Sequence, residues 1–391
     1  MRLDELRRLR TLLTDAAGPA DVFMALRDRS LRGDGQVLAL AAEVRRLQSL
    51  ANPERFMGNP PAQDLAREIQ ARLIELHEAA LQALPQGGGT STPVVEAPVV
   101  EAPIEPPPVR ADPPAQAHDV RFSLTIAERA YALEQVVTQG DVATIHRGRC
   151  TAGPHAGEEV AAKVAREAAD SAFILAEVQA LKLLHNGEGA QRKQLPTVRD
   201  MFHDASGRAG VVLPWLDGFD GAALRARFAR GLPPEHVIWI GRRLLSVAGF
   251  AHNLGVLHGN IEPAHIVVRP RDHHVTLIDW CYAVVEPART RQGFKVFNPD
   301  YSGPEVAEKK PPIPASDLYS IGRVLLFLLG GDMGTGDMPD EVDPKLQRFV
   351  RYLTRTSPLQ RAQDAWEMFS ELGRLRGQIY GPHRFQEFVV P

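Results

Sequence analysis

Residues 244–268, LLSVAGFAHNLGVLHGNIEPAHIVV, join an amphipathic helical run to a loop and then to a short apolar strand. The loop begins at His258 and carries three further polar side chains, those of Asn260, Glu262 and His265. A second apolar strand, VTLIDWC (275–281), follows and presents Asp279 at its end. An amide, two carboxylates and two imidazoles are therefore concentrated around one helix–loop–strand junction.

Strands dominate the region that precedes this junction. Residues 132–137 and 143–149 predict two strands around the turn 138–141, and 159–164 predict a third. The segment EVAAKVA (159–165) places Lys163 in a strand, and Glu177 follows inside the helical run SAFILAEVQALKLLH (171–185). At a surface, such a pair contributes at most about 1 kcal/mol, so these two residues alone support no functional conclusion.

Further segments complete an ordered series: AGVVLPWLDG (209–218), NPDYSGPE (298–305) and ASDLYSIG (315–322). In order and spacing, the series resembles the protein-kinase fold, with its V-A-x-K strand, helix glutamate, hinge, H-R-D loop, D-F-G, A-P-E and D-x-Y-S-x-G segments. The resemblance covers residues 121–375. It implies a two-lobed α+β domain over 120–378, with a small β-rich lobe, a larger helical lobe and a tail over 379–391.

The resemblance also assigns roles to single positions. Lys163 would approach the α- and β-phosphates of ATP while pairing with Glu177, and Asp279 would hold Mg²⁺. Other residues would line the nucleotide pocket: Gly140, Ile145, Ala161, Leu213, Trp215 and Val267. Structural roles fall to Glu305 with Arg361 as its buried partner, to Asp317 beneath the catalytic loop, and to a spine of Leu181, His258 and Trp280.

The departures from the family pattern lie at the atoms that do the chemistry. Asn260 stands at the catalytic-base position, and an amide is no base at neutral pH; such a base contributes about 10²–10⁴ in rate. Glu262 reverses the charge of the family's lysine. At about 4 Å and an effective dielectric constant near 20, it would repel each unit of phosphoryl charge by about 4 kcal/mol, so we expect it to turn away or bind a cation. His265 replaces the second magnesium ligand, and imidazole suits zinc or copper better.

The phosphate-covering loop is reduced as well. Against G-x-G-x-x-G, residues 138–143 keep Gly140 alone, and Asp141 adds a negative charge. We therefore expect weak or metal-independent nucleotide binding. Gly259 replaces the arginine that grips a phosphorylated activation segment in many kinases, which argues against that form of switching.

Residues 1–84 predict a helical module. Leu40, Val44 and Leu47 share one helical face, and a second helix carries Leu65, Ile69, Leu73, Leu76 and Ala80. The intervening ANPERFMGNPP (51–61) stops one helix and starts the next. Over 18–84 this resembles a degenerate J-domain, with Asn52-Pro53-Glu54 in place of His-Pro-Asp; an unrelated helical hairpin is the alternative. Residues 85–119 are rich in Pro, Ala and Glu, which predicts a flexible linker.

Composition restricts the function classes. The net charge of −3 over 391 residues creates no field for nucleic acid or anionic membranes. Cys150 and Cys281 lack disulfide or metal-ligand spacing, and neither a secretion signal nor a membrane span is recognisable, so we expect a cytoplasmic protein. His273 and His274 are interpreted as polar residues of an exposed turn.

Three functions remain open. The leading hypothesis is a bacterial pseudokinase, a nucleotide-responsive regulator or scaffold that binds protein partners through its helical module and its kinase-like domain. The alternative is an atypical active serine/threonine kinase that uses Lys163, Glu177 and Asp279 with ATP and Mg²⁺. The HGN and IDW segments (258–260 and 278–280) also resemble small-molecule phosphotransferases, which is the remote alternative.

Overall fold

The computed structural model describes residues 3–23, 40, 44, 47, 51, 53–56, 59–83 and 122–391. The chain divides into two compact units, Met1–Gln116 and Ala117–Pro391. The predicted linker over 85–119 lies outside the described residues, and so does Asn52 of the J-like tripeptide. The predicted domain boundaries and the J-domain relationship therefore stay predictions.

The first unit is helical in its described residues. It contains α1 (Leu3–Asp15), the short α2 (Pro19–Val22), a 3₁₀ turn (Pro53–Phe56) and α4 (Pro60–Ala83). The prolines at 60 and 61 open α4, where Asn59 Oδ1 accepts a hydrogen bond from Ala62 N at 3.3 Å. The predicted apolar stripe of α4 is confirmed, since Ile69, Leu73, Leu76 and Ala80 are buried. Helix α1, which the sequence analysis did not predict, packs Leu6 and Leu13 into the same core.

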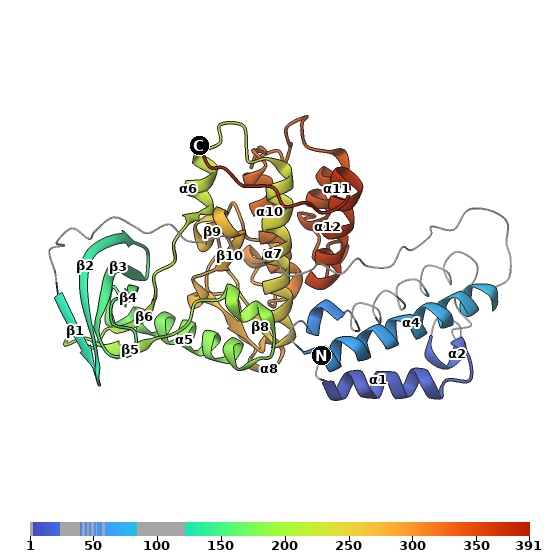
Figure 1. The fold of residues 1–391 in the computed structure, drawn as a ribbon, viewed down its shortest axis with the longest axis horizontal. Coiled ribbons are helices and arrows are strands. Elements are labelled where there is room, and N and C mark those ends of the chain that lie inside the picture. Colours follow the sequence, from blue (N-terminus) through green and yellow to red (C-terminus); the bar gives the residue numbers. More distant parts are fainter. Residues whose placement is uncertain are drawn as a thin grey trace. The chain divides into compact units, whose positions relative to one another are not determined.

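The second unit begins with a six-stranded antiparallel sheet in the order β1-β2-β3-β4-β6-β5. Its strands are β1 (Phe122–Ile126), β2 (Arg129–Gln139), β3 (Ala143–Ala152), β4 (Glu159–Ala165), β5 (Asp200–His203) and β6 (Ala209–Pro214). Helix α5 (Ser171–Asn186) packs against this sheet (Figure 1). The three strands predicted at the front of the region are confirmed as β2, β3 and β4.

Gly148 lets two of these strands lie close together. It lies opposite Leu133 where β3 pairs with β2. A Cβ atom at this position would lie 2.2 Å from the carbonyl oxygen of Ala132, far inside van der Waals contact. Only glycine allows this approach of the two backbones.

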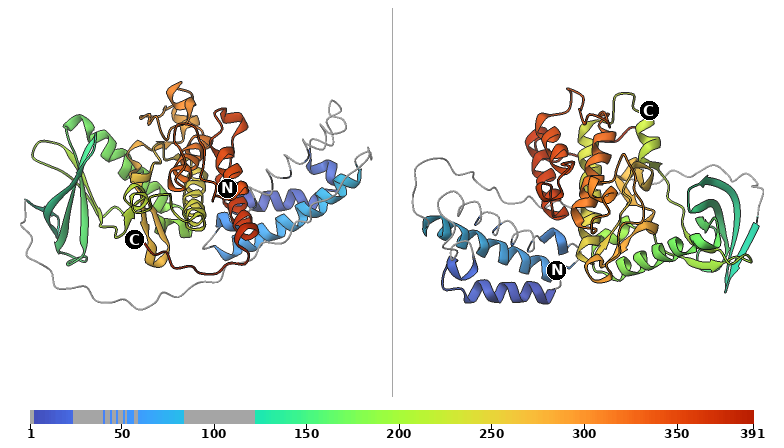
Figure 2. Two further views of the ribbon diagram at one scale, coloured as in Figure 1. Left: turned by 90° about the horizontal axis from the view of Figure 1, so that it is seen from above. Right: turned by 180° about the vertical axis from the view of Figure 1, so that it is seen from behind.

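The remainder of the second unit is mainly helical, and two further views separate it clearly from the sheet (Figure 2). Its helices are α6 (Gly221–Ala226), α7 (Pro234–Asn253), α8 (Pro287–Thr290), α9 (Pro304–Ala307), α10 (Pro314–Leu328), α11 (Pro344–Leu353) and α12 (Ala365–Tyr380). Short strands complete it: β7 (Phe219–Asp220), β9 (Ile266–Arg269) and β10 (His274–Leu277) form one sheet, and β8 (Val256–Leu257) pairs with β11 (Val284–Val285). Short 3₁₀ turns lie at 168–170, 190–194, 263–265, 270–272, 280–282 and 358–360.

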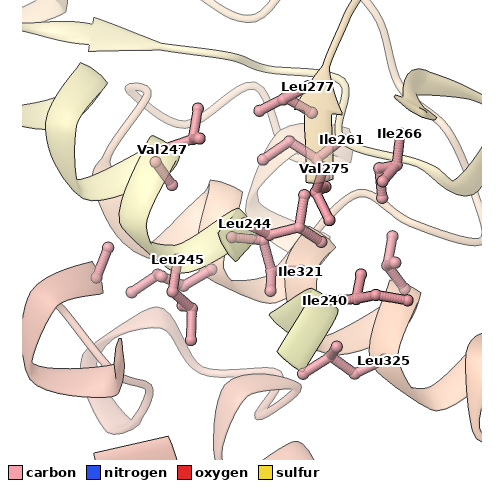
Figure 3. Close-up of a cluster of buried hydrophobic side chains, with 14 of the residues drawn as sticks. Ile240, Leu244, Leu245, Val247, Ile261, Ile266, Val275, Leu277, Ile321 and Leu325 are labelled. Carbon is pink, nitrogen blue, oxygen red and sulfur yellow. The ribbon is translucent and has the colours of Figure 1, made fainter. Parts of the chain in front are cut away.

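The core of the helical lobe lies around α7. Side chains of α7, α10 and the β9–β10 hairpin converge there, among them Leu244, Ile321 and Val275 (Figure 3). The same cluster holds Ile261 of the loop and Ile266 of the strand that follows it. Apolar anchors therefore lie on both sides of Glu262 and His265. Among the described residues, no helix combines the length and apolar character needed to cross a bilayer.

Candidate functional site

Lys163 projects from β4 into a buried ion pair. Its neighbours across the sheet are Ile145 on β3 and Val211 on β6. Helix α5 brings Glu177 to it, so that Lys163 Nζ lies 2.8 Å from Glu177 Oε2. The side chains are only 8% and 1% exposed, which separates this pair from the solvated surface pair that the two residues alone would suggest.

Asp279 extends the pair into a three-residue cluster that connects the two lobes. It follows β10 with φ 64° and ψ 60°, a left-handed conformation that is costly for a non-glycine residue and recurs at functional sites. Its Oδ1 accepts a hydrogen bond from Lys163 Nζ. The backbone N–H of Trp280 donates to Glu177 Oε1 at 3.2 Å. Glu177 and Asp279 are thus held on the same lysine.

Lys163 and Asp279 are held in their ionised forms by their charged neighbours. Burial alone would lower the pKa of Lys163, but Glu177 and Asp279 outweigh it and hold that pKa above its ordinary value. Burial would raise the pKa of Asp279, but Lys163 and His265 hold it well below its usual range. Burial raises the pKa of Glu177, against the opposing effect of Lys163. We assign Glu177 as a carboxylate, because it lies 2.8 Å from an ammonium group and accepts a backbone N–H.

His265 faces the other oxygen of Asp279. Its Nδ1 lies 2.8 Å from the carbonyl oxygen of Asn260 and must donate to it. Its Nε2 lies 3.1 Å from Asp279 Oδ2 and 3.3 Å from Glu262 Oε1. Burial would lower the pKa of His265, but these acceptors raise it above its ordinary value. Because both ring nitrogens face acceptors, the imidazolium form is favoured.

Both carboxylate oxygens of Glu262 have side-chain partners. One carboxylate oxygen faces His265, and the other accepts a hydrogen bond from Asn298 Nδ2 in the segment before α9. That Glu262 binds a cation stays a prediction; in the structure its Oε1 lies 3.3 Å from His265 Nε2. No group of three or more His, Cys, Asp or Glu side chains suited to a metal ion occurs in the described part of the chain.

The loop itself is held by Asp317, as the resemblance to protein kinases implied. Asp317 Oδ2 accepts from the backbone N–H of His258 and Oδ1 from that of Gly259, both at 2.9 Å. His252 Nε2 lies 2.9 Å from Oδ2 as a third partner. This buried carboxylate orders the turn that precedes Asn260.

His258 is a neutral core residue. Its Nδ1 accepts from the backbone N–H of Asn260 at 3.2 Å, and its Nε2 faces the carbonyl oxygen of Ile278 at 3.0 Å. Burial lowers the pKa of His258 to about 4. Its ring also contacts Trp280 edge-on at 4.6 Å, so the expected packing of these two residues is present, and Leu181 is fully buried in the same core.

The expected nucleotide wall is divided between the lobes. Ile145, Ala161, Leu213 and Trp215 lie on β3, on β4 and at the end of β6, where Ala161 pairs with Leu213. Val267 lies on β9 of the helical lobe, and all five side chains are partly exposed. Gly140 closes the β2–β3 turn with its N–H donating to Ala143 O at 2.9 Å, and a Cβ there would lie 3.7 Å from that oxygen. The β2–β3 turn therefore does not require glycine at position 140.

Sequence reasoning missed several contacts around this wall. The Arg147 guanidinium lies 4.5 Å from the ring centroid of Trp215 and forms two 2.8 Å hydrogen bonds to Glu159. Arg147 lies two positions after Ile145 on β3, so strand alternation could have placed both on one face. Asn298, by contrast, carries no local signal that links it to Glu262.

Two other expectations have opposite outcomes. Arg361 donates to Glu305 Oε1 at 2.7 Å and to Oε2 at 3.0 Å, which confirms the expected buried pair. The interpretation of His273 as an exposed polar residue is wrong, because its ring packs 4.4 Å from Trp239 and 4.8 Å from Phe385. Burial also lowers the pKa of His274, which is partly buried. Contacts with distant aromatic residues, invisible in the local sequence, cause this difference.

Comparisons with known proteins agree with this architecture. No protein-family model matches the chain. Serine/threonine-protein kinase PkaB of Streptomyces coelicolor is 29% identical over 214 residues, which are 51% of this chain and 48% of PkaB. Kinase pkn3 of Myxococcus xanthus is 26% identical over 245 residues, 60% of this chain and 42% of pkn3. PknL of Mycobacterium tuberculosis strain H37Rv is 26% identical over 294 residues, 68% of this chain and 69% of PknL.

The chain thus spans about half the length of PkaB and less than half of pkn3. A crystal structure of the Mycobacterium tuberculosis PknI kinase domain aligns with a TM-score of 0.48 and 19% identity, covering 64% of this chain and 96% of that domain. The sheet-rich lobe, the helical lobe and the relatives' shared description as serine/threonine-protein kinases lead to one conclusion. The chain has a two-lobed α+β fold of the protein-kinase type, similar to bacterial serine/threonine-protein kinases.

Proposed function

We propose that this protein is a pseudokinase that acts as a nucleotide-responsive regulator or scaffold. The observation that carries the proposal is that both carboxylate oxygens of Asp279 already have a cationic partner. One of its carboxylate oxygens accepts from Lys163, and the other lies 3.1 Å from His265 Nε2. A magnesium ion would have to displace two cationic partners, and the imidazole at the second ligand position is a poor donor for that metal. The donor set therefore does not fit Mg²⁺.

The same residues fit a nucleotide better than they fit its metal. Lys163 is the only ammonium group in the cluster, and the partly exposed apolar side chains on β3, β4 and β6 offer a surface for a base. Asn260 supplies no carboxylate that could accept a proton from an acceptor hydroxyl. Phosphoryl transfer depends mainly on positioning and on stabilising charge, and Glu262 supplies charge of the wrong sign.

The helical module supports the binding role. Its described residues form a separate small core, and we propose that it recruits a protein partner for the kinase-like domain. Because Glu54 stands where the J family has aspartate, we expect no stimulation of a heat-shock chaperone ATPase.

An atypical active serine/threonine kinase is the second candidate. The 2.8 Å contact between Lys163 and Glu177 and the inward-facing Asp279 favour it. In this function Lys163 would orient the phosphates, and a group other than Asn260 would receive the acceptor's proton.

Thermal melting with ATP tests the binding proposal. At a free ATP concentration of ten times Kd, binding stabilises the protein by about 1.4 kcal/mol, and we expect a rise of roughly 3–6 °C. The rise should be as large in EDTA as in magnesium, and Lys163→Ala should abolish it. Lys310→Ala, which alters an exposed lysine, serves as the matched control and should retain the rise.

Phosphate transfer decides between the two candidates. Purified protein, γ-labelled ATP, magnesium or manganese and a general protein acceptor should yield no labelled product. Label transfer that disappears in Asp279→Ala would refute the pseudokinase proposal. A melting shift that requires magnesium would refute the metal-independent binding mode.

A further inference from the structure

The last eleven residues, 381–391, form a C-terminal strap over the helical lobe. The strap follows α12 and continues to a chain end beside α6 (Figure 1). Phe388 within it is only 4% exposed. Its ring stacks 4.2 Å from His236, and Arg227 Nη1 donates to the carbonyl oxygen of Pro391 at 3.1 Å. The strap is therefore packed on the lobe through an aromatic side chain and held at its end by a hydrogen bond.

Two histidines lie beneath the strap. His236 is in the first turn of α7 and stacks on Phe388 at an interplanar angle of 25°. His273 is in the turn before β10, where φ is 52°, and its ring lies 4.8 Å from Phe385. The two imidazoles are 5.7 Å apart between ring centroids. The buried Phe388 and the half-exposed Phe385 thus each lie against an imidazole ring, and the two imidazole rings are close neighbours.

The surroundings of His273 favour a neutral ring. Burial lowers the pKa of His273 and outweighs a hydrogen bond to the backbone of Gln386 in the strap, which by itself would raise that pKa. Its Nε2 is buried and has no hydrogen-bond partner in the structure. A proton on that atom would create a buried charge with no acceptor, which is costly. A second positive charge on His236 would add repulsion between like charges.

The charged and titratable groups that act on the two rings come from all three packed elements. The charged or titratable neighbours of His236 are His273 and Glu235. The neighbours of His273 are Arg243, Asp272 and His383. Glu235 is already paired with Arg376 at 2.7 Å, and Arg243 and His383 oppose further positive charge. The acidic neighbours therefore do not offset the burial of a second proton.

We propose that residues 381–391 are a proton-released strap, docked while His236 and His273 are neutral and released when these histidines are protonated. The inference does not depend on nucleotide binding or on phosphate transfer. Release would uncover an aromatic surface that includes Phe228 and Trp239, both of which contact Phe388.

The direction of the pH dependence follows from the linkage between proton binding and docking. Burial is the main cause that lowers the pKa of both histidines in the docked state. The released state therefore binds more protons, and docking weakens as pH falls below about 6.5, the ordinary pKa of histidine. At pH 5.5, a histidine that can be protonated only after release weakens docking by about tenfold.

Tryptic cleavage of the full chain after the exposed Arg384, measured at about pH 7.5 and 5.5, tests the proposal. The free peptide GPHRFQEFVVP supplies the intrinsic cleavage rate at each pH. We expect the protection of this bond, relative to the free peptide, to fall by at least about tenfold at the lower pH, while the bonds after Arg242 and Arg243 of α7 stay protected. The α7 readout separates release of the strap from global unfolding.

Variants make the test specific. His236→Phe keeps an aromatic ring, and His273→Asn keeps a residue that tolerates positive φ; together they should remove the pH-dependent loss. His273→Asn alone should remove about half of the loss on a logarithmic scale. His155→Asn changes a histidine in the turn between β3 and β4 and should behave as wild type. Equal protection of the wild-type strap at both pH values, or a full loss in the double variant, would overturn the proposal.

Discussion

Removing the charge of Glu305 should destabilise the kinase-like domain strongly. The Glu305 and Arg361 side chains are 1% and 0% exposed and are joined by two hydrogen bonds. Glu305→Gln preserves the shape of the side chain but leaves the guanidinium charge buried without a counter-ion. Breaking a buried pair in this way costs about 3–5 kcal/mol. For a domain of this size, the melting temperature should fall by roughly 6–20 °C.

A matched control lies on α12. Glu371 and Arg374 form a pair of the same type, but their side chains are 35% and 60% exposed. Glu371→Gln should cost at most about 0.5 kcal/mol, or roughly 1–2 °C. The assay is thermal unfolding of both variants followed by circular dichroism. Equal melting temperatures for the two variants would refute the reasoning, because burial would then make no difference to the cost of losing a counter-ion.

A double variant separates the cost of the unpaired buried charge from the cost of the other lost hydrogen bonds. Arg361 also donates to the carbonyl oxygens of Ala315, Thr356 and Arg355. Glu305→Gln combined with Arg361→Met removes the uncompensated charge but leaves these three carbonyls without the guanidinium. Its melting temperature should therefore lie between those of Glu305→Gln and the wild type.

Three other outcomes are expected. The triple variant Asn260→Asp, Glu262→Lys and His265→Asn restores the residues of the kinase family and should create ATP-dependent phosphate transfer. The restored base alone should raise the transfer rate by about 10²–10⁴-fold, and equal rates for the wild type and the variant would contradict this. Gly148→Ala should cost about 1–3 kcal/mol or more through its 2.2 Å clash with Ala132 O, whereas Gly377→Ala, which meets nothing within 4 Å, should melt no lower than wild type. Because the folded pKa of His258 is about 4, stability should fall by about 3 kcal/mol between pH 6.5 and 4, and His258→Asn should flatten that slope.

Much of the fold could be predicted because its elements have local signatures. The alternation in EVAAKVA and the helical spacing around Glu177 identify β4 and α5 without reference to the rest of the chain. The order of the segments from Lys163 to Arg361 resembles that of protein kinases, and this resemblance implied the two-lobed arrangement. Helix α1 was missed because its charged residues interrupt the leucines that face α4.

The altered side chains at 260, 262 and 265 could also be recognised from the sequence, as could the loss of a base and of a magnesium ligand. The contacts that these side chains make could not be predicted from the sequence. Glu262 meets Asn298 across 36 positions, and Lys163 meets Asp279 across 116. The ionisation of each group depends on those partners and on burial, and neither is written in nearby residues.

Local residue patterns thus specified the elements, their order and the chemical types present at the junction. Only tertiary packing decided that Asp279 is shared by Lys163 and His265, and that the ring of His273 is partly buried against Trp239 and Phe385. The reason is physical: backbone preference acts over a few residues, whereas a buried charge or ring is stabilised by groups that the chain brings together from distant positions.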